Sequence, residues 1–278
     1  MNMNNKTIVI TGASDGIGLE AARALKKQGA NVVVIGRSPT KTKAVGKELD
    51  VPFFIADFSR LDEVRALAAK LRKAYPRIDV LANNAGGLFG DREVTVDGFE
   101  KTMQVNHLAH FQLTSLLMDI LVKSKATIIN TSSVANNFLS DLDIDDLNME
   151  KKYTAGKAYG NAKLENILFA KELNRLYGSK GVSAVAFHPG GVATNFGSEA
   201  NGFVKFLYHS PLKKYMGLIT PAKGADTLVW LASTEPRKDW TPGEYYVKRK
   251  IAKANAKAYD PKLATSLWKQ SAAMIKKD

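Results

Sequence analysis

Hydrophobic positions along the chain gather into short runs rich in β-branched residues, and longer amphipathic stretches lie between these runs. A short run with apolar residues on both faces predicts a buried strand, which is typical of parallel sheets covered by helices. Seven runs of this kind are predicted to be strands: residues 7–10, 32–35, 53–56, 78–82, 127–130, 182–187 and 245–247. The pattern therefore indicates an α/β protein.

The amphipathic stretches have the periodicity of helices and separate successive strands. Helices are predicted over residues 17–28, 61–75, 102–122 and 158–177, and a further helix begins near Pro221 and runs through Leu231. Each of the first four would form the crossover of a right-handed βαβ unit. The alternation predicts a Rossmann-like doubly wound parallel sheet of about seven strands, with helices on both faces. No linker divides residues 1–278, so we expect a single domain.

The composition fits a soluble globular protein and restricts its chemistry. The hydrophobic fraction is 45% and cysteine is absent, which excludes disulfides, thiolate metal sites and cysteine nucleophiles. The chain lacks an apolar run of the roughly 18 residues that a membrane-spanning helix needs. Its N-terminus also lacks the apolar core of a signal peptide. These features predict a soluble, cytoplasmic protein.

The net charge of +13 raises the question of an anionic partner. Residues 248–278 form a basic C-terminal extension with nine Lys or Arg residues against two acidic ones, so this extension carries +7 of the charge. Nucleic-acid binding would need a recognition module or an aromatic stacking platform, and the sequence has neither. We expect a solvated basic face, with membrane contact at most peripheral. A helical apolar stripe in the extension is predicted to pack on the core or on a partner: Leu263, Leu267, Met274 and Ile275.

A glycine-rich segment, TGASDGIG at residues 11–18, follows the first predicted strand and opens the first helix. Glycine lets the backbone turn tightly and approach a pyrophosphate, which is attracted by the free N–H groups at the helix N-terminus. This placement predicts a dinucleotide site. Asp15 within the segment argues weakly against it, because a phosphate gains nothing from an added carboxylate.

The second predicted strand is followed by Arg37, about 20 residues beyond the glycines. A domain that binds NAD usually carries Asp or Glu here, to hold the ribose 2′-hydroxyl. The arginine fork can instead hold a 2′-phosphate with two hydrogen bonds, and Lys41 is placed to assist from the next turn. The sequence therefore predicts a preference for NADP over NAD.

Tyr159 and Lys163 lie four residues apart on a predicted helix, so their side chains project from one face. A phenol with a pKa of about 10 is a poor acid–base catalyst at neutral pH. An ammonium about 4 Å away, at an effective dielectric constant of about 20, is worth about 4 kcal/mol, or about three pKa units. The lysine can therefore supply the shift in pKa that the tyrosine needs.

Taken together, these segments resemble the short-chain dehydrogenase/reductase superfamily, and within it the retinol-dehydrogenase-like branch. The resemblance covers nearly the whole chain. Besides TGASDGIG, it is carried by Asp57, by residues 83–86 (NNAG), by Asn106 in QVNHLAHF, and by residues 132–133, 159–163 and 188–194 (HPGGVAT). It implies an oxidoreductase that transfers a hydride between a nicotinamide and an alcohol or carbonyl substrate.

The resemblance also implies roles for the residues that would carry the reaction. Tyr159 would be the general acid in reduction and the base in oxidation, Lys163 would also hold the nicotinamide ribose, and Ser133 would hydrogen-bond the substrate oxygen. Ser132 remains an alternative to Ser133, because both lie at the end of a predicted strand. Asn106 would hold a water that passes protons from Lys163. Its alternative role is to satisfy local backbone groups.

The cofactor site implied by the resemblance draws on all of these segments. Asp57 and Phe58 would contact the adenine, the segment from Asn84 the ribose, and Val192 and Thr194 the carboxamide of the nicotinamide. The predicted cofactor-binding residues are Gly12, Ser14, Asp15, Gly16, Ile17, Gly18, Arg37, Asp57, Phe58, Asn84, Ala85, Gly86, Tyr159, Lys163, Pro189, Gly190, Val192 and Thr194.

Two long segments interrupt the alternation of strands and helices. Residues 134–157 form an insertion between the predicted catalytic serine and tyrosine, which the simplest family members lack and the retinol-dehydrogenase-like branch shares. Residues 196–219 carry aromatic and lysine side chains, and they are predicted either to cover an apolar substrate pocket as a lid or to pack in the core. A lid would favour a lipophilic substrate.

No metal site is predicted. Asp141, Asp143 and Asp145 alternate as the first ligands of a calcium loop do, but the sixth and twelfth positions of that loop lack the required glycine and glutamate. His107 and His110 are three residues apart on one predicted helix, without a further ligand set, so we expect packed or surface histidines.

The leading hypothesis is an NADP-dependent alcohol dehydrogenase or carbonyl reductase that acts on a small-molecule substrate and can form a homo-oligomer. The alternative is a regulator that senses NADP and binds a partner without catalysis. Such a regulator typically loses the tyrosine or the lysine, and this chain has both.

Overall fold

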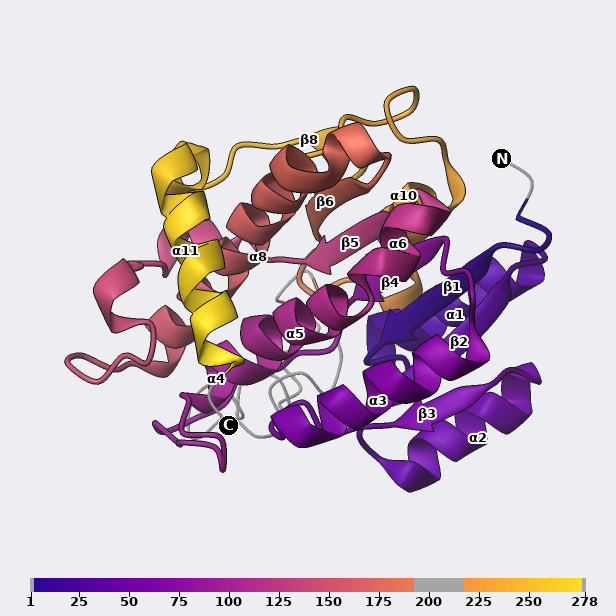
Figure 1. The fold of residues 1–278 in the computed structure, drawn as a ribbon, viewed down its shortest axis with the longest axis horizontal. Coiled ribbons are helices and arrows are strands. Elements are labelled where there is room, and N and C mark those ends of the chain that lie inside the picture. The colour runs from indigo at the N-terminus through magenta and orange to yellow at the C-terminus, as the bar shows by residue number, and fades with distance from the viewer. Residues whose placement is uncertain (1–2, 193–217, 277–278) are drawn as a thin grey trace.

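The computed structural model describes residues 3–192 and 218–276, and within these residues eight strands form one sheet (Figure 1). The strand order is β3-β2-β1-β4-β5-β6-β7-β8, in which neighbours are parallel except for the antiparallel pair β7 and β8. This order confirms the predicted Rossmann-like doubly wound sheet. The strands are β1 (Thr7–Thr11), β2 (Asn31–Gly36), β3 (Phe53–Ile55), β4 (Val80–Asn83), β5 (Thr127–Thr131), β6 (Ser183–His188), β7 (Tyr245–Val247) and β8 (Lys250–Ile251).

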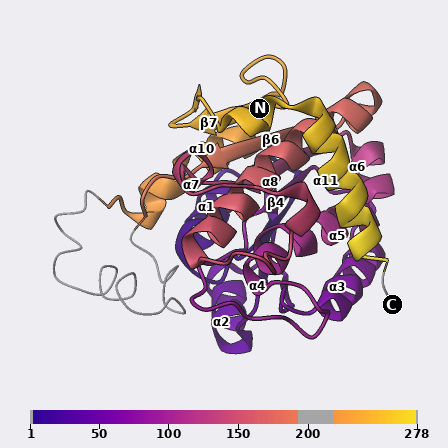
Figure 2. The ribbon, with the colours of Figure 1, turned by 90° about the vertical axis from the view of Figure 1, so that its left-hand side faces the viewer.

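Helices cover both faces of the sheet (Figures 1 and 2). One face packs against α1 (Gly16–Lys27), α2 (Pro39–Leu49) and α10 (Pro221–Ser233). The other face packs against α3 (Leu61–Ala74), α5 (Ala109–Leu116), α6 (Met118–Ser124) and α8 (Ala155–Tyr177). The C-terminal helix α11 (Pro261–Met274) lies outside α8 and buries Leu267 of the predicted apolar stripe in the same core.

The side chains of β1 explain why an all-apolar run is needed between two helix layers. Ile8 and Ile10 belong to the core on the side of α1 and α10, whereas Val9 belongs to the core on the side of α3 and α8. Successive residues of a strand point to opposite faces of the sheet. Because all three side chains are completely buried, a polar residue at any of these positions would meet one of the two cores.

Three elements depart from the sequence prediction. The prediction omits β8 and α2, although Ser38 caps the first turn of α2 and Pro39 starts it. The expected helix over residues 102–122 is divided into α4 (Lys101–Met103), a π-helical turn at Gln104–Leu108, α5 and α6. π-Helical turns of this kind are rare and often lie at functional sites. This one contains Asn106.

The insertion at residues 134–157 folds over the beginning of α8. It contains α7 (Ala135–Phe138) and a 3₁₀ turn at Ile144–Asp146, and its Leu142 and Leu147 belong to the core. Gly160 permits the close approach, because a Cβ atom there would lie 2.6 Å from the carbonyl carbon of Leu139. The insertion therefore packs directly beside Tyr159.

The predicted lid falls mostly outside the described residues. Thr194 and residues 196–217 are not among them, and only Leu218 and Ile219 can be placed. The backbone N–H of Ile219 donates to the carbonyl oxygen of Gly191 at 2.8 Å, so this end of the segment lies against the loop that follows β6.

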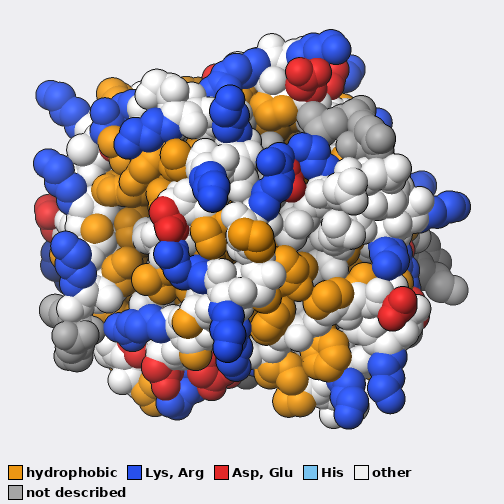
Figure 3. All heavy atoms as spheres, turned by 45° about the vertical axis from the view of Figure 1, so that its right-hand side comes forward, with side chains coloured by type: hydrophobic (Ala, Val, Ile, Leu, Met, Phe, Trp, Pro, Cys, Tyr) orange, Lys and Arg blue, Asp and Glu red, His pale blue; other side chains and the backbone are white. Residues whose placement is uncertain are grey.

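The described surface shows how the positive charge is distributed. On the face drawn in Figure 3, Lys and Arg side chains are spread between apolar and acidic ones rather than gathered in one patch. In residues 3–192 and 218–276, none of the helices has both the length and the apolar character that crossing a membrane requires.

Candidate active site

A cleft of about 930 Å³ opens at the carboxyl ends of the parallel strands. Gly12 reaches it from the end of β1, Asn84 from β4, Ser132 from β5 and Pro189 from β6. The strand order reverses between β1 and β4, which is where doubly wound sheets bind their ligands. Among the described residues, every predicted site residue except Asn106 lines this cleft.

The glycine-rich loop is shaped by two close backbone approaches. Gly12 has a φ of +66°, and a Cβ atom at this position would lie 2.7 Å from the Cα atom of Ala85. A Cβ atom at Gly18 would lie 2.4 Å from the carbonyl oxygen of Gly12. Both positions exclude any side chain. The loop therefore brings the N-terminus of α1 to the edge of the cleft, as a pyrophosphate site requires.

Asp15 has a structural role that explains a carboxylate in this loop. Its side chain caps α1 by accepting a hydrogen bond from the N–H of Gly16 at 2.7 Å. It also forms an ion pair with Lys41, at 3.0 Å between Oδ2 and Nζ. Part of its charge is therefore compensated by the cation that was expected to assist Arg37.

Thr11 joins two loops of the cleft, although it is not among the residues predicted to form the site. Its side-chain oxygen is fully buried at the end of β1, where it accepts hydrogen bonds from the backbone N–H groups of Asn84 and Ala85, both at 2.9 Å. The same oxygen lies 3.2 Å from the carbonyl oxygen of Ala82 and 3.2 Å from Nε2 of His110, which share its single hydrogen. One hydroxyl thus joins the glycine-rich loop to the loop that follows β4. A threonine directly before a glycine-rich loop is the signal that could have identified it.

The predicted adenine end of the cleft is lined by Arg37, Lys41, Asp57 and Phe58. Arg37 is exposed immediately after β2. Asp57 turns the chain after β3, because its carboxylate accepts from the N–H of Ser59 at 2.9 Å. Phe58 is buried and packs edge-on against the ring of His110, with 5.0 Å between the ring centroids.

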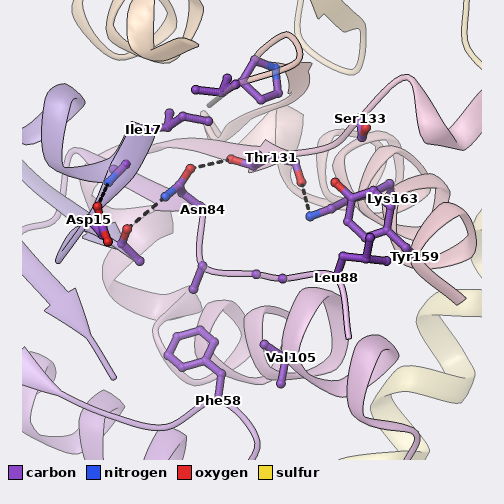
Figure 4. Close-up of a pocket in the computed structure, with 18 of the residues that line it drawn as sticks. Asp15, Ile17, Phe58, Asn84, Leu88, Val105, Thr131, Ser133, Tyr159 and Lys163 are labelled. Atoms are coloured by element: carbon purple, nitrogen blue, oxygen red, sulfur yellow. Dashed lines mark hydrogen bonds between the residues drawn. The ribbon is translucent and has the colours of Figure 1, made fainter. Parts of the chain in front are cut away.

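Tyr159 and Lys163 meet at the opposite end of the cleft, as their spacing on α8 predicts (Figure 4). The ammonium nitrogen of Lys163 lies 5.3 Å from the centroid of the Tyr159 ring and 3.3 Å from the carbonyl oxygen of Thr131, to which it donates. Only 2% of the Lys163 side chain surface is exposed, and this burial lowers its pKa to about 7. A lysine with this pKa can exchange a proton at neutral pH.

The two neighbouring serines have different surroundings. Ser132 is buried and its hydroxyl donates to the carbonyl oxygen of Lys163 at 2.6 Å, so this side chain holds α8 against β5. Ser133 is partly exposed in the cleft, and its hydroxyl oxygen accepts from the N–H of Ala135 at 3.2 Å. The hydroxyl hydrogen of Ser133 can therefore be donated to an acceptor that enters the cleft. The geometry therefore favours Ser133 over Ser132 as a group that contacts a substrate.

Asn106 lies behind the cleft wall, and its side chain is used by the backbone around it. Its Nδ2 donates to the carbonyl oxygens of Gly87 and Thr102, at 2.9 and 2.8 Å, and its Oδ1 accepts from the N–H of Gly87 at 3.2 Å. This arrangement matches the alternative role considered for Asn106. Its backbone carbonyl oxygen accepts side-chain hydrogen bonds from His110 and Asn166.

The two neighbouring histidines are buried within the helix layer. Burial lowers the pKa of His107 to about 4 and that of His110 to about 3, so both are neutral near pH 7. His107 Nε2 lies 3.0 Å from Ser271 Oγ, and His110 Nε2 lies 3.2 Å from Thr11 Oγ1. Within the described ranges there is no group of three or more His, Asp or Glu side chains that could hold a metal ion.

The sheet order, the glycine-rich loop and the cleft at the reversal point define a Rossmann-like protein of the type that binds dinucleotides. The profile of the family described as short chain dehydrogenase matches residues 6–203. The chain therefore belongs to the short-chain dehydrogenase/reductase family of oxidoreductases, as the sequence motifs predicted.

Relatives cover nearly the whole chain. A Streptomyces sp. (strain C5) protein named as a daunorubicin C-13 ketoreductase is 43% identical over 277 residues, covering 97% of this chain and 92% of its own. Human retinol dehydrogenase 13 is 34% identical over 281 residues, covering 97% of this chain and 84% of its own. These relatives confirm the resemblance to the retinol-dehydrogenase-like branch.

Solved structures share the fold. The crystal structure of an uncharacterized protein from Mycobacterium paratuberculosis aligns with a TM-score of 0.80 at 28% identity, covering 99% of this chain and 95% of that protein. A short chain dehydrogenase from Shigella flexneri, whose structure contains NADP, aligns with a TM-score of 0.63 at 28% identity, covering 83% of this chain and 92% of that one.

Proposed function

We propose that this protein is an NADP-dependent carbonyl reductase or alcohol dehydrogenase for lipophilic small molecules. The observation that carries the proposal is the meeting of Tyr159, Lys163 and Ser133 with the glycine-rich loop in one cleft. These residues come from α8, from the end of β5 and from the start of α1, so only the folded chain brings them together.

The described residues fit a nicotinamide dinucleotide. The side-chain-free surface at Gly12 and Gly18 leaves room for a pyrophosphate at the start of α1, and Asn84 to Gly86 line the middle of the cleft. When bound, the nicotinamide would supply or accept the hydride. Lys163 and Tyr159 would hold its ribose, while Pro189, Gly190 and Val192 line the cleft beyond them.

The chain's own residues supply the proton chemistry. In reduction, the hydroxyl of Tyr159 would donate a hydrogen bond and then a proton to the substrate oxygen, and Ser133 would hold the same oxygen. The ammonium of Lys163 would stabilise the phenolate that remains. Because the pKa of Lys163 is lowered to about 7, this lysine can itself release or regain a proton during turnover. In oxidation, the phenolate of Tyr159 would accept the proton of the alcohol.

The preference for NADP is supported by the cations at the predicted adenine end of the cleft. Arg37 follows β2 at the position where an acidic residue would hold an NAD ribose, and Lys41 lies beside it. The test is to measure the affinities of NADPH and NADH for the wild type and for Arg37→Asp. The wild type is expected to bind NADPH more tightly, and the variant to lose that preference. Equal affinities of the wild type for NADPH and NADH would overturn the proposed preference for NADP.

A lipophilic substrate is supported by apolar side chains that line the cleft around Ser133 and Tyr159. Val134, Phe138 and Leu139 are 40%, 80% and 44% exposed, although apolar side chains of this size are normally buried. The names of the relatives, which refer to retinol and daunorubicin, agree with this class of substrate. The physiological compound would therefore be a large apolar ketone, aldehyde or alcohol.

The activity is tested by following NADPH absorbance with a panel of apolar and small aldehydes and ketones. Tyr159→Phe is expected to bind NADPH as the wild type does and to lose turnover, because it keeps the ring and removes the proton donor. Turnover that survives in this variant would refute the assignment. NADPH binding without turnover of any compound would instead favour the alternative, a regulator that senses the cofactor.

The proposal also includes a cytoplasmic location and a small-molecule partner rather than a nucleic acid. The absence of cysteine agrees with a reducing compartment. Liposome co-sedimentation at several salt concentrations tests whether the basic extension adds contact with anionic membranes.

A further inference from the structure

The buried polar residues behind the cleft include a connected series that the proposed chemistry does not use. It begins at Ser271 on α11, passes through His107 in the π-helical turn and ends at Asn166 on α8. These three side chains are 1%, 1% and 2% exposed. A polar group at this depth must find a partner, because leaving it unpaired costs about 1–3 kcal/mol.

The direction of each hydrogen bond follows from the acceptors at the cleft end. Asn166 Nδ2 lies 3.0 Å from the carbonyl oxygens of both Asn106 and Thr131, which can only accept, so its two N–H groups are used there. Its Oδ1 must then accept from His107 Nδ1, at 3.4 Å. In the neutral imidazole, Nε2 is left as an acceptor, so the hydroxyl of Ser271 donates to it at 3.0 Å.

The series ends on the group that also binds the predicted catalytic lysine. The carbonyl oxygen of Thr131 accepts one hydrogen bond from Asn166 and another from the ammonium of Lys163, at 3.0 and 3.3 Å. Figure 4 shows Thr131 between Asn84 and Lys163 at the end of β5. The position of this carbonyl therefore affects how well the ammonium is stabilised.

We propose that α11 is a positioning element of the active site: Ser271 fixes the tautomer of His107, His107 orients the amide of Asn166, and Asn166 holds the Thr131 carbonyl that accepts from Lys163. The inference rests on the proposed function. Helix α11 lies beyond residues 6–203, the part of the chain that matches the family model. His107, Asn166 and Ser271 are positioning residues, because none of them lines the cleft.

Two substitutions at His107 separate hydrogen bonding from packing. The imidazole lies among aromatic rings, with centroids 5.7 Å from Phe169 and 6.2 Å from Phe111. His107→Phe keeps a ring in this cluster and removes both hydrogen bonds. His107→Asn removes the ring, while its amide nitrogen can take the place of Nδ1 and donate to Asn166.

A second pair of variants on α11 provides a matched control. Ser271→Ala removes the hydroxyl at the start of the series. Thr265→Val removes another α11 hydroxyl, which donates to Glu172 on α8 at 3.1 Å and has no connection to the series. Both variants lose one hydrogen bond between α11 and its neighbours, so a purely structural role predicts the same consequences for both.

The readouts are the melting temperature, the kcat and KM of the carbonyl reduction, and the pKa of Lys163 followed by NMR in ¹³C-lysine-labelled protein without cofactor. Lys163→Met assigns the lysine signal. The titratable groups facing Lys163 in the described structure are Tyr159 on its own helix and His110 on α5, and the variants change neither.

His107→Phe is expected to lower kcat about tenfold with little change in KM, since small misplacements of a catalytic group have effects of this size or larger. It should also lower the pKa of Lys163 further, because the ammonium loses a well-placed acceptor. His107→Asn should restore kcat and the pKa of Lys163 toward their wild-type values, despite a lower melting temperature. Ser271→Ala should shift kcat and the pKa of Lys163 in the same direction as His107→Phe does. Thr265→Val should change only the melting temperature.

The inference is overturned if His107→Phe retains the wild-type kcat and lysine pKa, or if His107→Asn is as impaired as His107→Phe. If His107→Phe does not fold, an identical lysine pKa in Ser271→Ala and Thr265→Val overturns it equally well. A wild type without turnover would refute the proposed function, while the NMR titration would still decide whether the series positions Lys163.

Discussion

Replacing Thr11 by valine tests whether one hydroxyl organises the floor of the cleft. Valine has nearly the shape of threonine, so the substitution removes the hydroxyl and little else. The side chain is completely buried, and no water can replace it without moving the strand end. The N–H groups of Asn84 and Ala85, each 2.9 Å from Thr11 Oγ1, would lose their acceptor.

The size of the effect follows from these two donors. A fully buried donor left without a partner costs about 1–3 kcal/mol, and these two are partly buried, so the pair predicts a loss of up to about 6 kcal/mol in the free energy of unfolding. This is a large part of the roughly 5–15 kcal/mol that stabilises a typical domain. NADPH should also bind more weakly, because the released segment after β4 forms the middle of the cleft.

Urea unfolding followed by circular dichroism measures the loss, which should appear as a lower midpoint with an unchanged slope. Thr11→Ser is the matched control, since it keeps the hydroxyl and removes one methyl group at a cost of about 1 kcal/mol. A Thr11→Val protein that is no less stable than Thr11→Ser would refute the reasoning.

Three further predictions concern the glycine-rich loop, a buried carboxyl group and the apolar side chains that line the cleft. Gly18→Ala places a Cβ atom 2.4 Å from the carbonyl oxygen of Gly12, so NADPH affinity should fall at least about tenfold by fluorescence titration; an unchanged Kd would contradict it. Burial, and secondarily the charge of Glu100, raises the pKa of Glu165 to about 8 from 4.5, so the folded state keeps a proton that the unfolded state releases and stability falls between these pH values. Glu165→Gln should therefore gain stability over the wild type as the pH rises through this window, whereas a pH-independent difference in urea unfolding would argue against it. Phe138→Ser should change the free energy of unfolding by less than about 0.5 kcal/mol, because the side chain is 80% exposed. It should lower kcat/KM for apolar ketones about tenfold and leave kcat/KM for small ketones unchanged. Equal losses for both kinds of ketone would contradict a role of Phe138 in binding apolar substrates.

The fold was predictable because its signals are local. Residues 8–10 are apolar at successive positions, which is typical of a strand covered on both faces. The helix over residues 102–122 was harder, because a π-helical turn has no distinct hydrophobic period and the sequence gives no sign of the division into α4, α5 and α6. β8 escaped prediction because two residues are too short for any pattern.

The candidate site divides in the same way. Tyr159 and Lys163 could be paired from the sequence, because a spacing of four on a helix determines that they share a face. Thr11 had only the signal of its place before the glycine-rich loop. Asn166 and Ser271 could not be recognised, because their hydrogen bonds join segments that lie far apart along the chain. For Lys163, the sequence shows that its side chain shares a helix face with Tyr159. Its lowered pKa could not be predicted, because it depends on burial in the folded protein.

The sequence alone determined the order of the strands β1 to β7 and which reactive side chains follow which strand. These properties depend on residues close together along the chain, whose spacing controls the face on which a side chain lies. Only the tertiary structure decided that Ser132 holds α8 while Ser133 faces the cleft, that the insertion packs beside Tyr159, and that α11 connects to Lys163. Those outcomes depend on contacts between distant segments, and hydrogen-bond partners of that kind exist only after the sheet and both helix layers have assembled.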